Sequence, residues 1–163
     1  MKKLRFISVF LLIALLFSCG VKKDRGAKDT LREFIGALPD VPPGSLYLSE
    51  AALYDEEKPL TSELLLSLYA KEDGTLEYEG LVREAALYLG SSPDTPFEVA
   101  VFVSFANTDT DALLEMCHRR AALVERVFPG TIPNARYFTL DKVLIFCLST
   151  DPSSAEQAFQ RLR

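Results

Sequence analysis

The sequence predicts an α+β fold in which helices pack on a mostly antiparallel sheet of about four strands. Three observations support this fold class. Residues 97–105 alternate with the period of a strand, residues 108–128 carry an apolar stripe at helical spacing, and residues 136–149 contain a pair of apolar segments around a polar turn. With the flanking helices, the predicted order is α-α-β-β-α-β-β-α.

Two helices are expected in the first half of the chain. Thr30 and Glu33 have the spacing of a capping box, which predicts a short helix that ends before Pro39. Thr61 can cap a second helix over Ser62–Ala70.

Two segments allow no single interpretation. Leu46–Leu60 has no clear periodicity. Leu81–Leu89 favours a helix by its Leu, Glu and Ala content, whereas its position between Gly80 and Gly90 suits a strand.

The second half has clearer signals. Phe97–Phe105 is expected to be a strand with one strongly apolar face, and Thr108 or Asp109 to cap a long helix that reaches about Phe128. The order then continues with a strand pair and a terminal helix.

The strand pair is expected at Arg136–Thr139 and Lys142–Ser149, and the second strand is apolar on both faces and therefore central. Ser153 and Glu156 form another capping box, which predicts a terminal helix with Phe159 on its inner side.

The N-terminus has the pattern of an export signal. Lys2, Lys3 and Arg5 precede an apolar run over residues 6–17 that only Ser8 interrupts. Such a run is about 18 Å long as a helix, too short for a hydrocarbon core of about 30 Å. We therefore interpret residues 1–18 as a signal peptide.

The end of this segment, Leu16-Phe17-Ser18-Cys19, resembles the lipobox of bacterial lipoproteins. The resemblance implies that Cys19 is diacylglycerylated and becomes the first mature residue. A covalent lipid, such as palmitate, would then hold the chain on the outer side of the cell membrane. The alternative is cleavage near Ser18 and release.

Charge divides the mature chain into two parts. Residues 19–28 are expected to be a lipidated, basic, flexible tether, and residues 29–163 a single extracytoplasmic domain. From Asp29 onward 22 acidic side chains outnumber 11 basic ones. A domain this acidic is a poor candidate for binding nucleic acid.

The second half also resembles a family of small bacterial lipoproteins known as domain of unknown function 4358. The similarity lies in Phe97–Phe102, in the helix that carries His118-Arg119-Arg120, and in the Asp151 turn before the last helix. It implies a lipid-anchored α+β domain and favours a strand at Leu81–Leu89, but it implies no reaction.

Cys117 and Cys147 are the thiols that remain when Cys19 is acylated, and export permits a disulfide between them. The alternative is two small buried hydrophobic side chains. These cysteines and His118 do not make a metal site, because a fourth ligand and a CxxC spacing are missing.

Arg119, Arg120 and Arg126 are candidates for a small anion-binding patch on the long helix, although solvated arginines that pair with acids are more common. The carboxylates at Asp55–Glu57 and Glu72–Glu79 lack the spacing of a calcium loop. Solvated faces are the simpler interpretation.

No catalytic motif, cofactor site or metal site is predicted. The expected function is that of a non-catalytic module that is anchored to the bilayer through Cys19 and binds another cell-surface protein. The alternative is a lipoprotein that binds a small ligand or solute.

Overall fold

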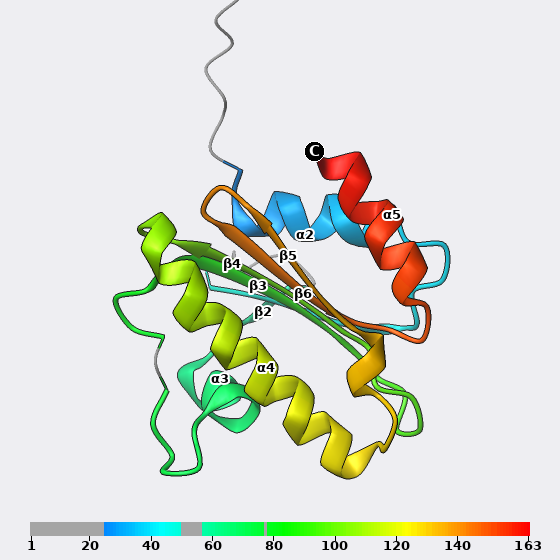
Figure 1. Ribbon diagram of the computed structural model, residues 1–163, viewed down its shortest axis with the longest axis horizontal. Coiled ribbons are helices and arrows are strands. Elements are labelled where there is room, and N and C mark those ends of the chain that lie inside the picture. Colours follow the sequence, from blue (N-terminus) through cyan, green and yellow to red (C-terminus); the bar gives the residue numbers. More distant parts are fainter. Residues whose placement is uncertain (1–24, 50–56, 77) are drawn as a thin grey trace, which may run out of the picture.

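The structure is a computed structural model that describes residues 25–49, 57–76 and 78–163. Within these residues, four α-helices surround a six-stranded mixed sheet with the strand order β2-β1-β3-β4-β6-β5 (Figure 1). The elements are α2 Ala27–Gly36, β1 Gly44–Leu48, β2 Lys58–Pro59, α3 Ser62–Tyr69, β3 Val82–Gly90, β4 Glu98–Ser104, α4 Thr110–Val127, β5 Ala135–Leu140, β6 Val143–Leu148 and α5 Pro152–Leu162.

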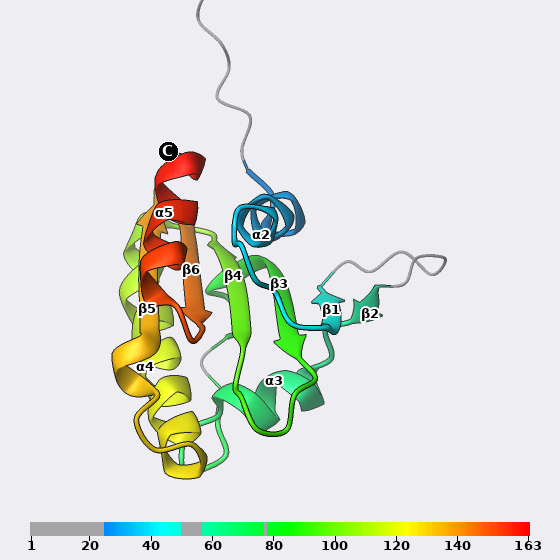
Figure 2. The same cartoon turned by 90° about the vertical axis from the view of Figure 1, so that its right-hand side faces the viewer.

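Helices cover both faces of the sheet, so the domain has three layers (Figure 2). Because side chains alternate along a strand, β4 contributes to two cores. Val99 and Val101 pack against α2 and α5, whereas Ala100 and Phe102 pack against α3 and α4. Every residue of β4 is buried, which makes this strand the centre of the fold.

The predicted α+β class is confirmed, but the expectation of about four strands is wrong, because the described residues form six. The two extra strands, β1 and β2, lie in the first half of the chain. The pairing of β1 with β2 is parallel, and the other pairings are antiparallel. Lys58–Pro59 is short and exposed, and such an edge strand leaves no periodic signal.

The segment that suited either a helix or a strand is a strand. Residues Val82–Gly90 form β3, which pairs with β1 on one side and β4 on the other. Hydrogen bonds to two neighbouring strands outweigh the modest helix preference of Leu, Glu and Ala.

The expected helix start at Thr30 is wrong. The helix begins at Ala27, and Thr30 lies inside it, 1% exposed, where its hydroxyl donates to the Gly26 carbonyl at 2.8 Å. The backbone N–H of Ala27 donates instead to Glu84 Oε2 of β3 at 3.0 Å. An N–H group at the start of this helix is thus paired with a residue 57 positions away in the chain. The local sequence cannot reveal such a partner.

Of two further predicted helix caps, one is confirmed and one is wrong. Thr61 accepts a hydrogen bond from Leu64 N at 3.2 Å, as predicted. The capping box at Ser153 is wrong, because Asp151 is the N-cap and accepts from the backbone N–H groups of Ser153 and Ser154. Pro152 at the first helical position favours this start.

The long helix starts where predicted, with Asp109 as its N-cap residue, but the Asp109 side chain does not cap it. A 3₁₀ turn, Asn107–Asp109, precedes α4, and the Asp109 carboxylate accepts from Ala106 N at 2.9 Å rather than from an N–H group of α4. The predicted strand pair after α4 is confirmed as β5 and β6, with Asp141 in the left-handed conformation (φ 53°) at the turn between them.

Candidate functional site

A buried polar network joins helix α4 to the first residue of the central strand. Glu98 is 2% exposed, and its Oε2 accepts from Nε and Nη2 of Arg120, at 2.8 Å each. Its Oε1 accepts a hydrogen bond from the hydroxyl of Tyr69, at the end of α3. Three elements therefore meet at one carboxylate.

The charge states in this network follow from burial and pairing. Burial raises the pKa of Tyr69 well above its usual value, and the negative charge of Glu98 adds to the effect. Tyr69 therefore remains a hydrogen-bond donor. Burial of Arg120 disfavours its charge, but Glu98 more than offsets this and raises the pKa of Arg120. Arg120 therefore stays charged at neutral pH.

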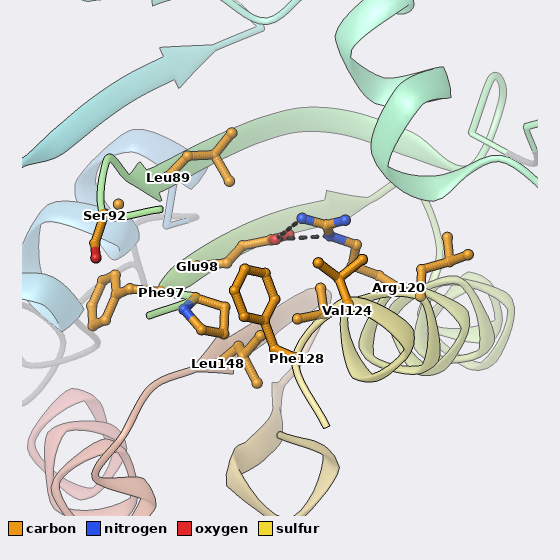
Figure 3. Close-up of a pocket in the computed structure, with 12 residues that line it drawn as sticks. Leu89, Ser92, Phe97, Glu98, Arg120, Val124, Phe128 and Leu148 are labelled. Atoms are coloured by element: carbon orange, nitrogen blue, oxygen red, sulfur yellow. Dashed lines mark hydrogen bonds and ion pairs between the residues drawn. The ribbon is translucent and has the colours of Figure 1, made fainter. Parts of the chain in front are cut away.

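A pocket of about 260 Å³ opens beside the ion pair (Figure 3). Glu98 and Arg120 are the charged residues in its lining, and Arg120 keeps 18% of its side chain exposed. Most of the remaining wall is apolar and comes from the ends of β3 and β6, from the loop before β4 and from the C-terminal end of α4: Leu89, Leu148, Pro96, Phe97, Val124 and Phe128.

The pocket lies far from the start of the described chain. Helix α2 begins beside Glu84, near the start of β3, and the pocket lies at Leu89 and Gly90, where β3 ends. Six residues of strand span about 20 Å. The start of α2 and the end of α4, which contributes to the pocket, accordingly lie at opposite ends of the molecule (Figures 1 and 2).

Two exposed apolar side chains lie at the end of α4 and in the loop after it. Val127, which lines the pocket, is 69% exposed, and Ile132, which does not line it, is 50% exposed. The Glu125 carboxylate fixes this loop by accepting from the backbone N–H groups of Gly130, Thr131 and Ile132, at 2.6–2.8 Å. These hydrogen bonds lower the pKa of Glu125, so the carboxylate stays charged.

The structure does not bring the two predicted disulfide cysteines together. Both thiols are free and buried. Cys117 packs in the core between the sheet and helices α3 and α4, whereas Cys147 faces the core on the α2 and α5 side. The sheet separates them because alternation along β6 turns Cys147 away from α4.

The three arginines proposed as an anion patch have different surroundings. Arg120 is committed to Glu98, and Arg126 is 69% exposed with its Nη2 3.5 Å from Glu72. The Nε and Nη2 atoms of Arg119 are buried and have no hydrogen-bond partner among the described residues. A single convergent patch is therefore not formed.

The remaining candidates are surface features. His118 is half exposed. Its ring centroid lies 4.4 Å from that of Tyr137 in an edge-on arrangement, and its Nδ1 lies 3.8 Å from Oε1 of Glu115. Asp73 accepts from Thr75 in a local turn. Among the described residues, no three His, Cys, Asp or Glu side chains gather as a metal site.

Some predicted residues lie outside the described part of the chain. These are Cys19, Asp55, Glu56 and Glu77. In the described part, no helix has both the length and the apolar character needed to cross a membrane.

Sequence reasoning missed the Tyr69–Glu98–Arg120 network. It placed Glu98 on the less apolar face of its strand, although Ala100 and Phe102 on that face are also apolar. A carboxylate in a strand that is apolar on both faces requires a buried cationic partner, and this was the available signal.

Comparisons with known proteins identify no relative. No family model, no curated protein and no solved structure matches the chain. The site must therefore be interpreted from its own geometry.

Proposed function

We propose that the chain is a lipid-anchored, non-catalytic module that docks another cell-surface protein at the α4 pocket. The observation that carries the proposal is an apolar pocket beside Val127, a largely exposed apolar residue at the end of α4. Exposed apolar surface around a concave site is typical of protein docking.

The size of the pocket favours a partner's side chain over a free ligand. Small-molecule sites usually enclose about 300–1,000 Å³ and bury most of the ligand. The present pocket holds about 260 Å³, so it suits one large side chain. The small-ligand alternative would require a larger enclosed space.

The anchor and the pocket are arranged for recognition away from the membrane. If Cys19 carries lipid, the segment to Arg25 extends no more than about 20 Å. The end of α4, which contributes Val127 to the pocket lining, lies at the end of the molecule opposite the start of α2 (Figure 2). A partner can then approach the pocket without meeting the bilayer.

Part of the basic charge near the anchor is already neutralised. Arg25 lies 3.5 Å from Glu33, and Lys28 lies 2.7 Å from Glu57. In this proposal lipid supplies the membrane affinity, and attraction of the tether to anionic headgroups is secondary. Membership of the family called domain of unknown function 4358 is part of the same proposal.

The test is a photo-crosslinking amino acid placed at Val127 in living cells. The matched control is Leu66, an exposed apolar residue on α3 that does not line the pocket. We expect one discrete protein adduct from position 127, none from position 66, and loss of the adduct with Cys19→Ala. Equal adducts at both positions, or none at 127, would refute the docking site. Unchanged membrane fractionation of Cys19→Ala would refute the anchor.

A further inference from the structure

We infer that the side chain of Phe105 enters the lipid surface beside the anchor and gives the domain a second contact with the membrane. This inference rests on the proposed attachment through Cys19 and concerns how the anchored domain is oriented. A single lipid attachment leaves a domain free to rotate about its tether. A second contact at the same end of the molecule keeps the α4 pocket on the side that faces away from the bilayer.

Phe105 is an exposed aromatic side chain on a well-supported part of the fold. It follows β4 directly and is 54% exposed. Its backbone N–H donates to the Leu81 carbonyl at 3.1 Å, and the N–H of Ser104 donates to a carbonyl in the turn between β5 and β6 at 2.9 Å. On the other side, the Asp109 carboxylate accepts from the N–H of Ala106 at 2.9 Å. The backbone is thus held on both sides of a phenyl ring that the core does not cover.

Phe105 lies at the end of the sheet where the tether enters the fold. The N–H of Ala27, at the start of α2, donates to Glu84 of β3, and Glu84 pairs with Val103 of β4. Phe105 lies two residues beyond Val103, which is about 7 Å along a strand. The start of α2, the turn between β5 and β6 and the start of α4 lie together at this end (Figures 1 and 2).

The tether is short enough to keep this end close to the bilayer. If Cys19 carries lipid, the segment to Arg25 extends no more than about 20 Å. The other exposed large apolar side chains of the described residues lie farther from the start of α2, on α3 and at or after the end of α4 (Figure 2): Leu66, Val127 and Ile132. Phe105 is therefore the exposed apolar side chain that is placed to reach lipid.

The charges beside Phe105 indicate an apolar contact rather than attraction to anionic headgroups. Asp141 and Lys142, in the turn that accepts from Ser104, are both exposed, so an acid and a cation lie near the ring. The domain as a whole has an excess of acidic residues. Moving an apolar ring from water into the membrane interface is favourable without any charge. The contact should therefore form on zwitterionic lipid and gain little from anionic lipid.

The chain contains no tryptophan, so a single tryptophan can report contact with lipid. Full-length, lipidated Phe105→Trp is reconstituted in phosphatidylcholine vesicles with brominated acyl chains, which quench tryptophan fluorescence on contact. Leu66→Trp and Val127→Trp are the matched controls, because each replaces an exposed apolar residue away from the start of α2. We expect quenching at position 105 to be at least about threefold stronger than at either control, since interfacial side chains lie about 5–10 Å deep. Adding phosphatidylglycerol should change it by less than about twofold.

A second reporter leaves Phe105 in place. Asn107→Trp puts the probe two residues away, on the exposed connection to α4, and is compared with the same variant that also carries Phe105→Asp. We expect quenching when Phe105 is present and its loss with Phe105→Asp. Urea denaturation checks that both chains are folded, and substitution of an exposed residue should leave the transition nearly unchanged.

The outcomes separate the membrane contact from the anchor. If the chain floats with vesicles but position 105 is quenched no more than position 66, the anchor stands and the contact is overturned. Quenching that persists with Phe105→Asp overturns the role of this side chain, and stronger quenching at position 127 overturns the orientation. If the wild-type chain and Cys19→Ala bind vesicles equally, the anchor fails and this inference fails with it. Docking at the pocket is tested separately by the adduct at position 127 in cells.

Discussion

Arg120 directs two guanidinium nitrogens, Nε and Nη2, to a single carboxylate oxygen of Glu98, at 2.8 Å each. This contact joins the middle of α4 to the start of β4 beneath an apolar pocket. The neighbouring Arg119 has two buried nitrogens without a partner in the described chain. We therefore expect Arg120 to stabilise the folded state and the guanidinium of Arg119 to contribute no stabilisation.

Removing Arg120 should destabilise the fold strongly. Arg120→Met leaves the carboxylate of Glu98 buried without its cation, and breaking such a pair costs about 3–5 kcal/mol. Urea denaturation at pH 7 measures the loss. Arg126→Met is the matched control, and its exposed partner predicts a change within about 0.5 kcal/mol. Equal effects of the two variants would contradict the assignment.

Removing Arg119 should not destabilise the fold. Arg119→Met keeps much of the aliphatic packing but eliminates two buried donors that lack acceptors, so the free energy of unfolding should stay constant or rise. The same urea experiment measures it. A loss similar to that of Arg120→Met would show that Arg119 has an essential partner.

Neither buried cysteine should react in the folded protein. Burial raises the pKa of Cys147 to about 12 and that of Cys117 well above its usual value, so thiolate is scarce at neutral pH. We expect maleimide to label both only after urea unfolding, and intact-mass analysis to find two free thiols. A mass lower by two hydrogens, and restored by reductant, would show a disulfide. That result would contradict the placement of the two cysteines on opposite faces of the sheet.

Acid should weaken the cap of the last helix. Hydrogen bonds from Ser153 and Ser154 lower the pKa of Asp151 to about 2, below its value in an unfolded chain. The folded state therefore binds fewer protons, and the stabilisation is present above about pH 4 and lost as the pH falls toward 2. Asp151→Ala should lower the free energy of unfolding at pH 7 and make a much smaller difference near pH 2. An undiminished difference at pH 2 would exclude this linkage.

Much of the fold follows from local patterns. The period of two at Phe97–Phe105 and the stripe along α4 locate β4 and its covering helix, although β4 is buried on both faces. The cap at Thr61 is similarly local. The candidate pocket was beyond sequence reasoning, because its charged pair comes from residues 22 positions apart.

The sequence by itself determined the α+β class and the excess of acidic over basic residues, since each depends on composition or short-range order. Tertiary structure alone decided that Val82–Gly90 is a strand, that Glu84 caps α2, and that Cys147 faces away from α4. These features depend on which segments meet across the sheet. Contacts between distant segments leave no periodic trace in the chain.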